Sequence, residues 1–302
     1  MSSYICVGVS VLDRIWRVTG LPLAAGKQVT GDFLETGGGL AATAAVAIAR
    51  LGERCAYWGR VGDDLAGRAV LDEFEREGID ASAVRRVPGA RTTQSAILVA
   101  PGGERSIVAY FDPALDPDPA FLPLERVATA RGVLADTRWI PGSLRALGEA
   151  RRVGVPSVLD IEPGAREDNA PLCALAGHKV FSEPGLAAYA GRDDPEPALE
   201  EAYREHGGVA AVTLGARGVL LRTEGGLVHV PAPRVDAVDT TGAGDAFHGA
   251  YLVGIAETGD PIAAARFACA VAALKCTRLG GRAGLPSRAD VQAFVATGKA
   301  MA

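Results

Sequence analysis

The chain has 302 residues, of which 48% are hydrophobic and 22% are charged. This composition is typical of a soluble globular protein and excludes an intrinsically disordered one. The formal net charge of -5 argues against nucleic acid as the main partner, because phosphate-binding surfaces usually make a domain basic.

Early strand and helix patterns alternate along the chain. Residues 4–12 form an apolar run that predicts a buried strand. The Ala-rich segment 40–51 predicts a helix that stops at Gly52. Residues 55–62 then predict a strand and residues 66–78 a helix.

The rest of the chain continues this alternation. Short apolar runs predict further strands at 132–136, 156–161, 179–182 and 209–215. Helical patterns predict late helices at 242–258, 261–276 and 287–297. Strands separated by helices are typical of βαβ units, so the chain predicts an α/β fold with a mainly parallel sheet.

Two strand-like insertions interrupt this alternation, at about 14–36 and 91–111. The second is centred on Pro101-Gly102-Gly103, which is a hairpin signal. We therefore predict one domain over residues 1–302 that carries a small, separate β-sheet built from these insertions.

The five cysteines are odd in number and include no C-x-x-C pair. No 18-residue apolar run is present, and no basic stretch precedes an apolar core at the N-terminus. These features predict a reduced, cytoplasmic protein without a membrane partner.

The most informative motif is Asp239-Thr240-Thr241-Gly242-Ala243-Gly244-Asp245, at the start of a predicted helix. Glycines at a helix start let several backbone N–H groups converge on one anion, aided by the positive end of the helix. A carboxylate beside that anion is electrostatically unfavourable unless it has a function. One such function is that of the base that deprotonates an alcohol during phosphoryl transfer. The alternative is a tight turn in which Asp245 is only a first-turn charge.

Other phosphate and metal motifs are absent from the sequence. No G-x-x-x-x-G-K-[ST] occurs, no G-x-G-x-x-G follows the first strand, and no H-E-x-x-H or paired Cys/His spacing exists. The four histidines are scattered, and we interpret them as structural.

Together these segments resemble the ribokinase-type (PfkB) family of ATP-dependent carbohydrate kinases, over nearly the whole chain. Residues 37–52 and 59–67 resemble its N-terminal signature, and residues 239–245 resemble its C-terminal signature. The resemblance implies a three-layer α/β sandwich with a central, mainly parallel sheet and a small β-sheet lid over the sugar. It also implies ATP and Mg²⁺ as cofactors, leaves open a monovalent cation such as K⁺, and suggests a homodimer formed through the lid.

The resemblance assigns roles to the residues of the motif and of the sugar site. Asp245 is the implied catalytic base, and the implied anion hole consists of Gly242, Ala243 and Gly244. The residues implied to bind the sugar are Asp13, Gly38, Gly39 and Thr43. A carboxylate can accept two hydroxyl protons, and glycine permits close backbone approach. Thr43 stands where many members carry an asparagine.

The implied nucleotide site takes residues from several loops. Its residues are Thr213, Gly215, Gly218, Thr241 and Gly280, and the segment 276–281 resembles the adenine pocket of the family. Many members carry N-x-x-E near Mg²⁺, whereas residues 182–185 read Ser-Glu-Pro-Gly here. Glu183 is therefore the remaining candidate metal ligand in this segment.

Within the family, the chain is most similar to the sulfofructose kinases, for example in residues 94–97 and 276–284. Lys27 and Arg138 match the cations expected around the sulfonate, whereas Ala109 stands where an asparagine is expected. The alternatives are a solvated charge for Lys27 and a strand-end ion pair with Asp136 for Arg138.

These observations predict an ATP-dependent kinase that phosphorylates a primary hydroxyl of a small ketose. The best candidate substrate is 6-deoxy-6-sulfofructose, which would give the 1-phosphate. The alternatives are a fructose, ketohexose or other sugar kinase of the same family, a nucleoside kinase, and a non-catalytic sugar sensor. A nucleoside kinase would need aromatic residues over the base, which Trp16, Tyr110 and Phe111 could supply.

Overall fold

The computed structural model describes residues 3–21, 26–101, 104–115 and 118–297. Within these ranges the chain forms a nine-stranded sheet with the order β13-β12-β11-β10-β9-β8-β1-β4-β5. All neighbours from β11 to β5 are parallel, and β12 and β13 are antiparallel. The strands are β1 (Tyr4–Val7), β4 (Cys55–Gly62), β5 (Asp80–Val87), β8 (Gly132–Asp136), β9 (Ser157–Ile161), β10 (His178–Ser182), β11 (Val209–Thr213), β12 (Val219–Thr223) and β13 (Gly226–Val230).

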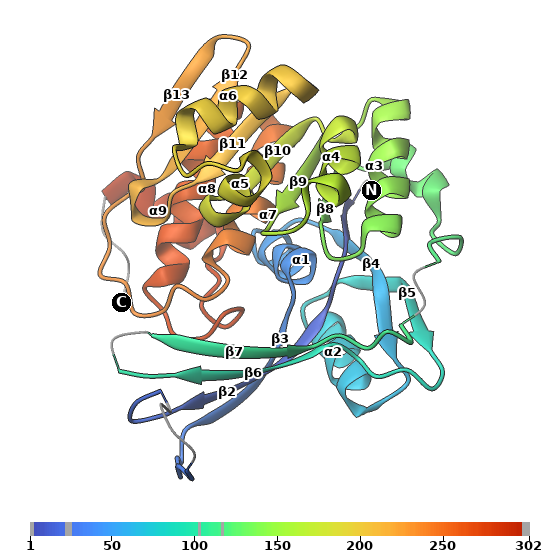
Figure 1. Cartoon of the computed structure of the whole chain (residues 1–302), viewed down its shortest axis with the longest axis vertical. Helices are drawn as coiled ribbons and strands as arrows, with labels where there is room; N and C mark the ends of the chain where they lie inside the picture. The colour runs from blue at the N-terminus through green and yellow to red at the C-terminus, as the bar shows by residue number, and fades with distance from the viewer. Residues whose placement is uncertain (1–2, 22–25, 102–103, 116–117, 298–302) are drawn as a thin grey trace.

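Helices cover both faces of this sheet, and each face has its own hydrophobic core. One layer comprises α1 (Leu40–Arg50), α2 (Leu65–Arg76), α7 (Ala243–Thr258), α8 (Pro261–Cys276) and α9 (Arg288–Thr297). The other comprises α3 (Ile140–Val153), α4 (Arg166–Leu175), α5 (Glu183–Ala190) and α6 (Pro195–His206). The predicted three-layer α/β architecture is confirmed (Figure 1).

A second sheet, which we call the lid, lies below the main body in Figure 1. Its strand order is β3-β2-β6-β7, and its strands are β2 (Val11–Arg17), β3 (Phe33–Gly38), β6 (Gln94–Val99) and β7 (Arg105–Tyr110). These strands fall in or next to the two predicted insertions. Residues 102–103 of the predicted hairpin turn and residues 22–25 of the first insertion lie outside the described residues.

The prediction of one strand over residues 4–12 is wrong, because the chain leaves the large sheet after Val7. A Cβ atom at Gly8 would lie 2.0 Å from Oδ2 of Asp136, so the chain passes very close to that carboxylate. The backbone N–H of Val9 donates to the same oxygen at 2.9 Å. Asp13 therefore lies in a lid strand and not at the end of the first strand of the large sheet.

Register divides the lid residues between two faces, because residues paired across a sheet share a face and neighbours along a strand alternate. Asp13 pairs with Ser95, which pairs with Ala109. Trp16 is three residues from Asp13 along β2, so it lies on the opposite face together with its partner Phe33. The lid thus has one face that carries Asp13 and one outer face that carries aromatic residues.

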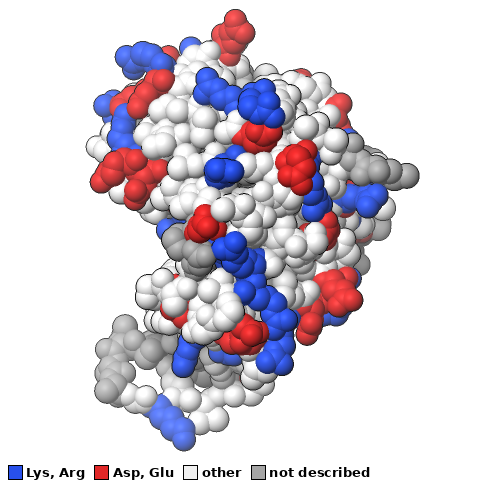
Figure 2. All heavy atoms as spheres, turned by 90° about the vertical axis from the view of Figure 1, so that its right-hand side faces the viewer, with Lys and Arg blue, Asp and Glu red and all other residues white. Residues whose placement is uncertain are grey.

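The surface carries both signs of charge. Figure 2 shows basic and acidic side chains in small mixed groups over the face that it presents. Among the described helices, none has the length and apolarity needed to cross a membrane.

Candidate active site

A buried carboxylate, Asp136 at the end of β8, organises the centre of the site. Its oxygens accept hydrogen bonds from the backbone N–H groups of Val9 (2.9 Å), Ala41 (3.2 Å) and Arg138 (2.9 Å). Burial raises the pKa of Asp136, and these hydrogen bonds oppose the rise. One side chain thus fixes the start of α1 and the departure of the chain toward the lid. Sequence analysis assigned it no role in the site, although an acid ending an apolar strand was a signal.

The predicted sugar-binding residues Asp13 and Gly38 lie together. A Cβ atom at Gly38 would lie 2.0 Å from Oδ2 of Asp13, so only glycine leaves room for this carboxylate. Ser95, which the sequence did not single out as a site residue, donates its hydroxyl proton to Oδ1 of Asp13. Burial raises the pKa of Asp13, while Ser95 and the charge of Arg282 lower it.

The start of α1 depends on the third glycine of the Gly37-Gly38-Gly39 run. Gly39 has a φ of 93° and caps α1. A Cβ atom there would lie 2.3 Å from the carbonyl oxygen of Val9, so a larger residue would displace the chain. Thr43, in the first turns of α1, is buried and accepts a hydrogen bond from Nε of Arg282 at 3.3 Å.

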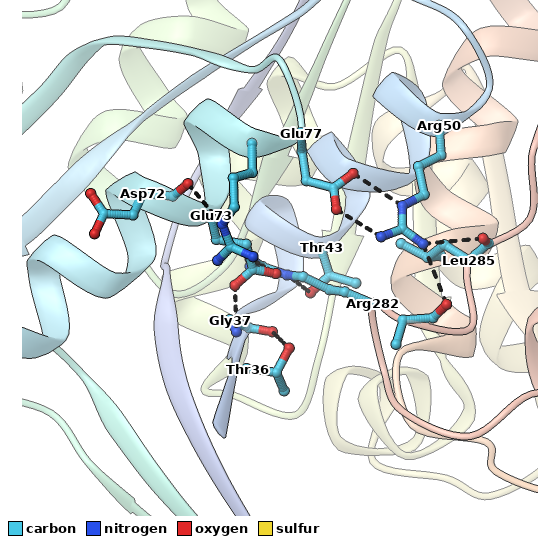
Figure 3. A network of polar contacts seen from close by, with 11 residues as sticks. Thr36, Gly37, Thr43, Arg50, Asp72, Glu73, Glu77, Arg282 and Leu285 are labelled. Atoms are coloured by element: carbon cyan, nitrogen blue, oxygen red, sulfur yellow. Dashed lines mark hydrogen bonds and ion pairs between the residues drawn. The ribbon is translucent and has the colours of Figure 1, made fainter. Parts of the chain in front are cut away.

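Arg282 is the centre of the polar network in Figure 3, although it is only 1% exposed. Its Nη2 donates to the carbonyl oxygen of Gly38 at 2.7 Å, and its Nη1 lies 3.3 Å from Oε1 of Glu73. Oε2 of Glu73 in turn accepts the backbone N–H of Gly37 at 2.6 Å. At Thr43, where many family members carry an asparagine, the guanidinium group of Arg282 thus supplies hydrogen-bond donors. Arg282 lies in the segment 276–284 noted above for its similarity to the sulfofructose kinases, but the sequence gave no indication of its partners.

A second ion pair in Figure 3 anchors the loop that carries Arg282. Arg50, at the end of α1, binds both carboxylate oxygens of Glu77, at 3.0 and 2.7 Å. Its Nη1 also donates to the carbonyl oxygens of Ala283 (3.3 Å) and Leu285 (3.4 Å). This arrangement holds the C-terminal loop against α1 and α2.

The predicted anion hole lies at the start of α7. Gly242 has a φ of 74° and caps the helix. The N–H of Ala243 donates to the carbonyl oxygen of Thr240 at 3.2 Å. The backbone N–H groups of Gly242 and Gly244 have no acceptor among the described residues. A Cβ atom at Gly244 would have no atom from outside its own stretch of helix within 4 Å, so the helix start is open at this residue.

Asp245, in the first turn of α7, lies among other acids. Burial raises its pKa well above the ordinary value for aspartate, and the charge of Glu162 adds to the rise, while Arg282 opposes it. Glu162 follows β9, and burial also raises its pKa. A carboxylate with a raised pKa, next to an open helix start, can accept a proton from a bound alcohol. Sequence analysis missed Glu162.

Two cavities meet at the motif 239–245. One, of about 610 Å³, is lined by Thr213, Gly215 and Gly218 together with Ala243 and Gly244. This cavity matches the predicted nucleotide loop and opens onto the start of α7.

The other cavity, of about 590 Å³, lies between the lid and the motif. Thr241 and Gly280 line it, so two residues predicted to bind ATP face the lid cavity. Nη1 of the lid residue Arg105 donates to Oγ1 of Thr241 at 3.0 Å. The lid therefore contacts the phosphate motif directly.

The two predicted anion-binding cations are exposed and lie on separate elements. Lys27 lies between β2 and β3, and Arg138 follows β8. Among the described residues, neither side chain forms an ion pair, so the strand-end pair between Arg138 and Asp136 is not formed. Asp136 binds the backbone N–H of Arg138 instead. A role in substrate binding remains a prediction for both residues.

Outer-face residues of the lid are unsuited to contact the substrate. Trp16 and Tyr110, which pairs with Gln94, both lie on the face opposite Asp13. Tyr110 therefore cannot replace the asparagine expected at Ala109, and Trp16 cannot stack on a base beside Asp13. Ala109 itself lies on the face that carries Asp13.

Glu183, the predicted metal ligand, is paired with another residue. It begins α5 and forms an ion pair with Arg217 of the nucleotide loop. Among the described residues, no group of three or more His, Cys, Asp or Glu side chains is arranged to hold a metal ion. A metal-binding role for Glu183 remains a prediction.

A helix start with free backbone N–H groups, a carboxylate in its first turn and an adjacent cavity are the features expected of a phosphoryl-transfer enzyme. A model of the pfkB family carbohydrate kinases matches residues 1–288. The fructokinase of Klebsiella pneumoniae is 31% identical, over 92% of this chain and 98% of its own length. The ribokinase of Bacillus subtilis (strain 168) is 30% identical, over 89% and 91%. A ribokinase-like protein of Agrobacterium tumefaciens has a crystal structure with a TM-score of 0.92 at 36% identity, covering 97% of this chain and 96% of that one. The chain therefore belongs to the pfkB family of carbohydrate kinases, and the prediction of an enzyme is confirmed in preference to a non-catalytic sensor.

Asp245→Asn tests the predicted base. The amide keeps the shape of the side chain but cannot accept the hydroxyl proton, so kcat should fall by roughly 10²–10⁴-fold. Nucleotide affinity and Tm should stay close to the wild-type values. Asp260→Asn, at the start of the next helix, is the matched control. An Asp245→Asn enzyme with near wild-type kcat would show that another group takes the proton.

The raised pKa of Asp245 predicts a pH dependence. The base form is lost as the pH falls through this raised pKa, so kcat/KM for the sugar should decline on the acid side above the ordinary aspartate range. Glu162→Gln removes a neighbouring negative charge and should move this decline to lower pH. Glu183→Gln, whose charge does not shift the pKa of Asp245, should leave its position unchanged. An identical acid limb in Glu162→Gln and wild type would contradict the assignment.

Proposed function

We propose that this carbohydrate kinase transfers the γ-phosphoryl group of ATP to a primary hydroxyl of a small ketose. The observation that carries the proposal is the start of α7, where Gly244 lines the cavity of about 610 Å³ and Asp245 is the next residue of the helix. ATP occupies the cavity of about 610 Å³, with its adenine toward the Cys276 side and its phosphates at the start of α7. The sugar lies under the lid, with its hydroxyls on Asp13.

Each group has one task in the transfer. Asp245 accepts the proton of the attacking hydroxyl, whose oxygen forms a bond to the γ-phosphorus. The bond between that phosphorus and the oxygen bridging to ADP breaks, and the pair of electrons stays on ADP. The N–H groups of Gly242 and Gly244 donate to the transferring phosphoryl oxygens, where negative charge collects. Arg282 holds Gly38 in place and offsets the charges of Asp13 and Asp245.

The residues at the site fit a magnesium ion that accompanies the nucleotide. Mg²⁺ prefers oxygen ligands and binds through one or two carboxylates plus substrate phosphates. Glu162 and Asp245 raise the local negative charge, and a divalent cation would offset it. When bound, the ion would neutralise charge on the phosphates. Glu162 is a better candidate than Glu183, which is paired with Arg217.

The substrate carries an anion at the end distant from the reacting hydroxyl, and 6-deoxy-6-sulfofructose is the first candidate. Arg138 and Lys27 support this proposal, since both side chains are exposed and unpaired among the described residues. Arg138 follows the same strand end as Asp136, next to the sugar side of the site. Its planar guanidinium can hold two anion oxygens. Plain fructose remains the alternative, in agreement with the fructokinase similarity.

A nucleoside substrate is less well supported by the lid. Trp16 and Tyr110 lie on the outer face, so of the three proposed aromatic residues only Phe111, beyond the end of β7, is not placed there by the strand register.

A comparison of sulfofructose with fructose tests the anion. Wild-type kcat/KM should favour sulfofructose, and Arg138→Ala should reduce that preference by about tenfold, or about 1.4 kcal/mol. Arg145→Ala removes the same charge from an exposed position on α3 and serves as the control. Equal use of both sugars by the wild-type enzyme would make it a plain ketose kinase.

We further propose a homodimer through the lid. The outer face carries Trp16, Phe33, Val108 and Tyr110, and Val108 is 71% exposed. In addition, β7 is an edge strand with every residue exposed, and such edges are usually covered.

The dimer can be tested by sedimentation. The wild-type chain should sediment as a dimer, and Val108→Glu should shift it toward the monomer because a carboxylate would be buried in the interface. Val295→Glu, on exposed α9, is the control. A wild-type monomer at micromolar concentration would contradict the proposal.

A further inference from the structure

Lys275 is a charged residue whose burial needs an explanation. Among the described residues, Lys179 and Lys275 are lysines with no exposed surface. Lys275 lies in the last turn of α8. Its Nζ donates to the carbonyl oxygen of Asp239 at 2.7 Å and lies 4.0 Å from Oδ2 of the same residue. Desolvation of an ammonium group is costly, so this contact must compensate for it.

Asp239 connects two segments of the active site. Its Oδ1 accepts the N–H of Thr241 at 2.9 Å, and its Oδ2 accepts the N–H of Gly280 at 2.9 Å. The first bond shapes the turn that leads into Gly242, and the second holds the loop that carries Arg282. Burial by itself would raise the pKa of Asp239, but these hydrogen bonds and the charge of Lys275 lower it, so the carboxylate stays ionised.

We propose that the ammonium group of Lys275 is a built-in cation that holds the turn 239–242 in its anion-binding shape. It takes the place of a bound monovalent cation, so this kinase does not depend on K⁺. The proposal rests on the proposed role of Gly242 and Gly244 in binding the phosphoryl group. Lys275 is a positioning residue, because it acts through Asp239.

The geometry around Nζ supports this role. A carbonyl oxygen and a carboxylate oxygen of one residue form the kind of oxygen set that binds alkali cations, which exchange water for carbonyl oxygens. A tethered ammonium supplies the same charge and cannot dissociate. Its contacts are with Asp239, the first residue of the turn, so we expect its loss to disturb the turn before the sheet.

Lys179 provides a matched control within the chain. Its Nζ donates to the carbonyl oxygens of Ala176 (3.2 Å) and Gly207 (2.5 Å), near the amino end of β10. The candidate site lies at the opposite, carboxyl edge of the sheet. A buried lysine with a purely structural role should therefore behave like Lys179.

The experiment measures kcat, Tm and nucleotide affinity for wild type, Lys275→Ala, Lys275→Met and Lys179→Ala, in buffers containing Na⁺, K⁺, NH₄⁺ or ethylammonium. We expect wild-type kcat to be the same in every salt. Both Lys275 variants should lose about tenfold or more in kcat. Lys275→Ala should recover activity with K⁺, NH₄⁺ or ethylammonium, because the alanine leaves space for the ion. Lys275→Met should not recover, because its side chain fills that space.

Four outcomes would overturn the proposal. The first is a clear stimulation of the wild-type enzyme by K⁺ over Na⁺, which needs no variant and so does not depend on folding. The second is an unchanged kcat in Lys275→Met. The third is a folded, inactive Lys275→Ala that no cation restores, and the fourth is a Lys179→Ala that the same cations restore. Asp245→Asn in the same salts separates this test from the proposed mechanism, because an inactive base variant must stay inactive in all of them.

Discussion

Negative charge is concentrated at the carboxyl edge of the large sheet, and the surrounding structure has to tolerate it. Asp13, Asp136 and Asp245 are acids whose pKa burial raises, and the charge of Glu162 raises that of Asp245 further. An isolated buried carboxylate would simply take up a proton. Here backbone N–H groups stabilise Asp136, and the guanidinium of Arg282 offsets Asp13 and Asp245. The predicted base, Asp245, therefore has a raised pKa, and the charge of Arg282 partly offsets the rise.

That charge balance also explains why the C-terminal loop packs against the N-terminal helices. Arg282 bonds to Gly38 and to Thr43, and it pairs with Glu73 on α2 (Figure 3). Arg282 therefore joins the end of the lid strand β3 to both α1 and α2. Its charge also acts on Asp245 in α7. The same guanidinium thus contacts Gly38 beside Asp13 and lowers the pKa of Asp245.

Local sequence signals predicted the elements and the motif, since they depend on nearby residues. The α7 motif starts a helix because Gly242 adopts a positive φ, and the α1 boundaries follow from its alanines and flanking glycines. The contacts of Arg282 with Thr43 and of Asp136 with Val9 join residues far apart in the chain, so periodicity could not reveal them. The first strand was misplaced for the same reason, because a distant carboxylate bends the chain at Gly8.

The strand register of the lid decides which of the residues predicted to contact the substrate share a face with Asp13. Strand alternation puts Asp13, Ser95 and Ala109 on one face and Trp16 and Tyr110 on the other. The polar side chains of Asp13 and Ser95 and the aromatic side chains of Trp16 and Tyr110 therefore lie on opposite faces of the lid. The Asp13 face offers the Asp13 carboxylate and the Ser95 hydroxyl together with aliphatic side chains such as Ile15 and Ile97. The small side chain of Ala109 offers no hydrogen-bond donor on that face, and we therefore propose that Arg138, which is exposed and follows the strand end that carries Asp136, contacts the distal end of the sugar.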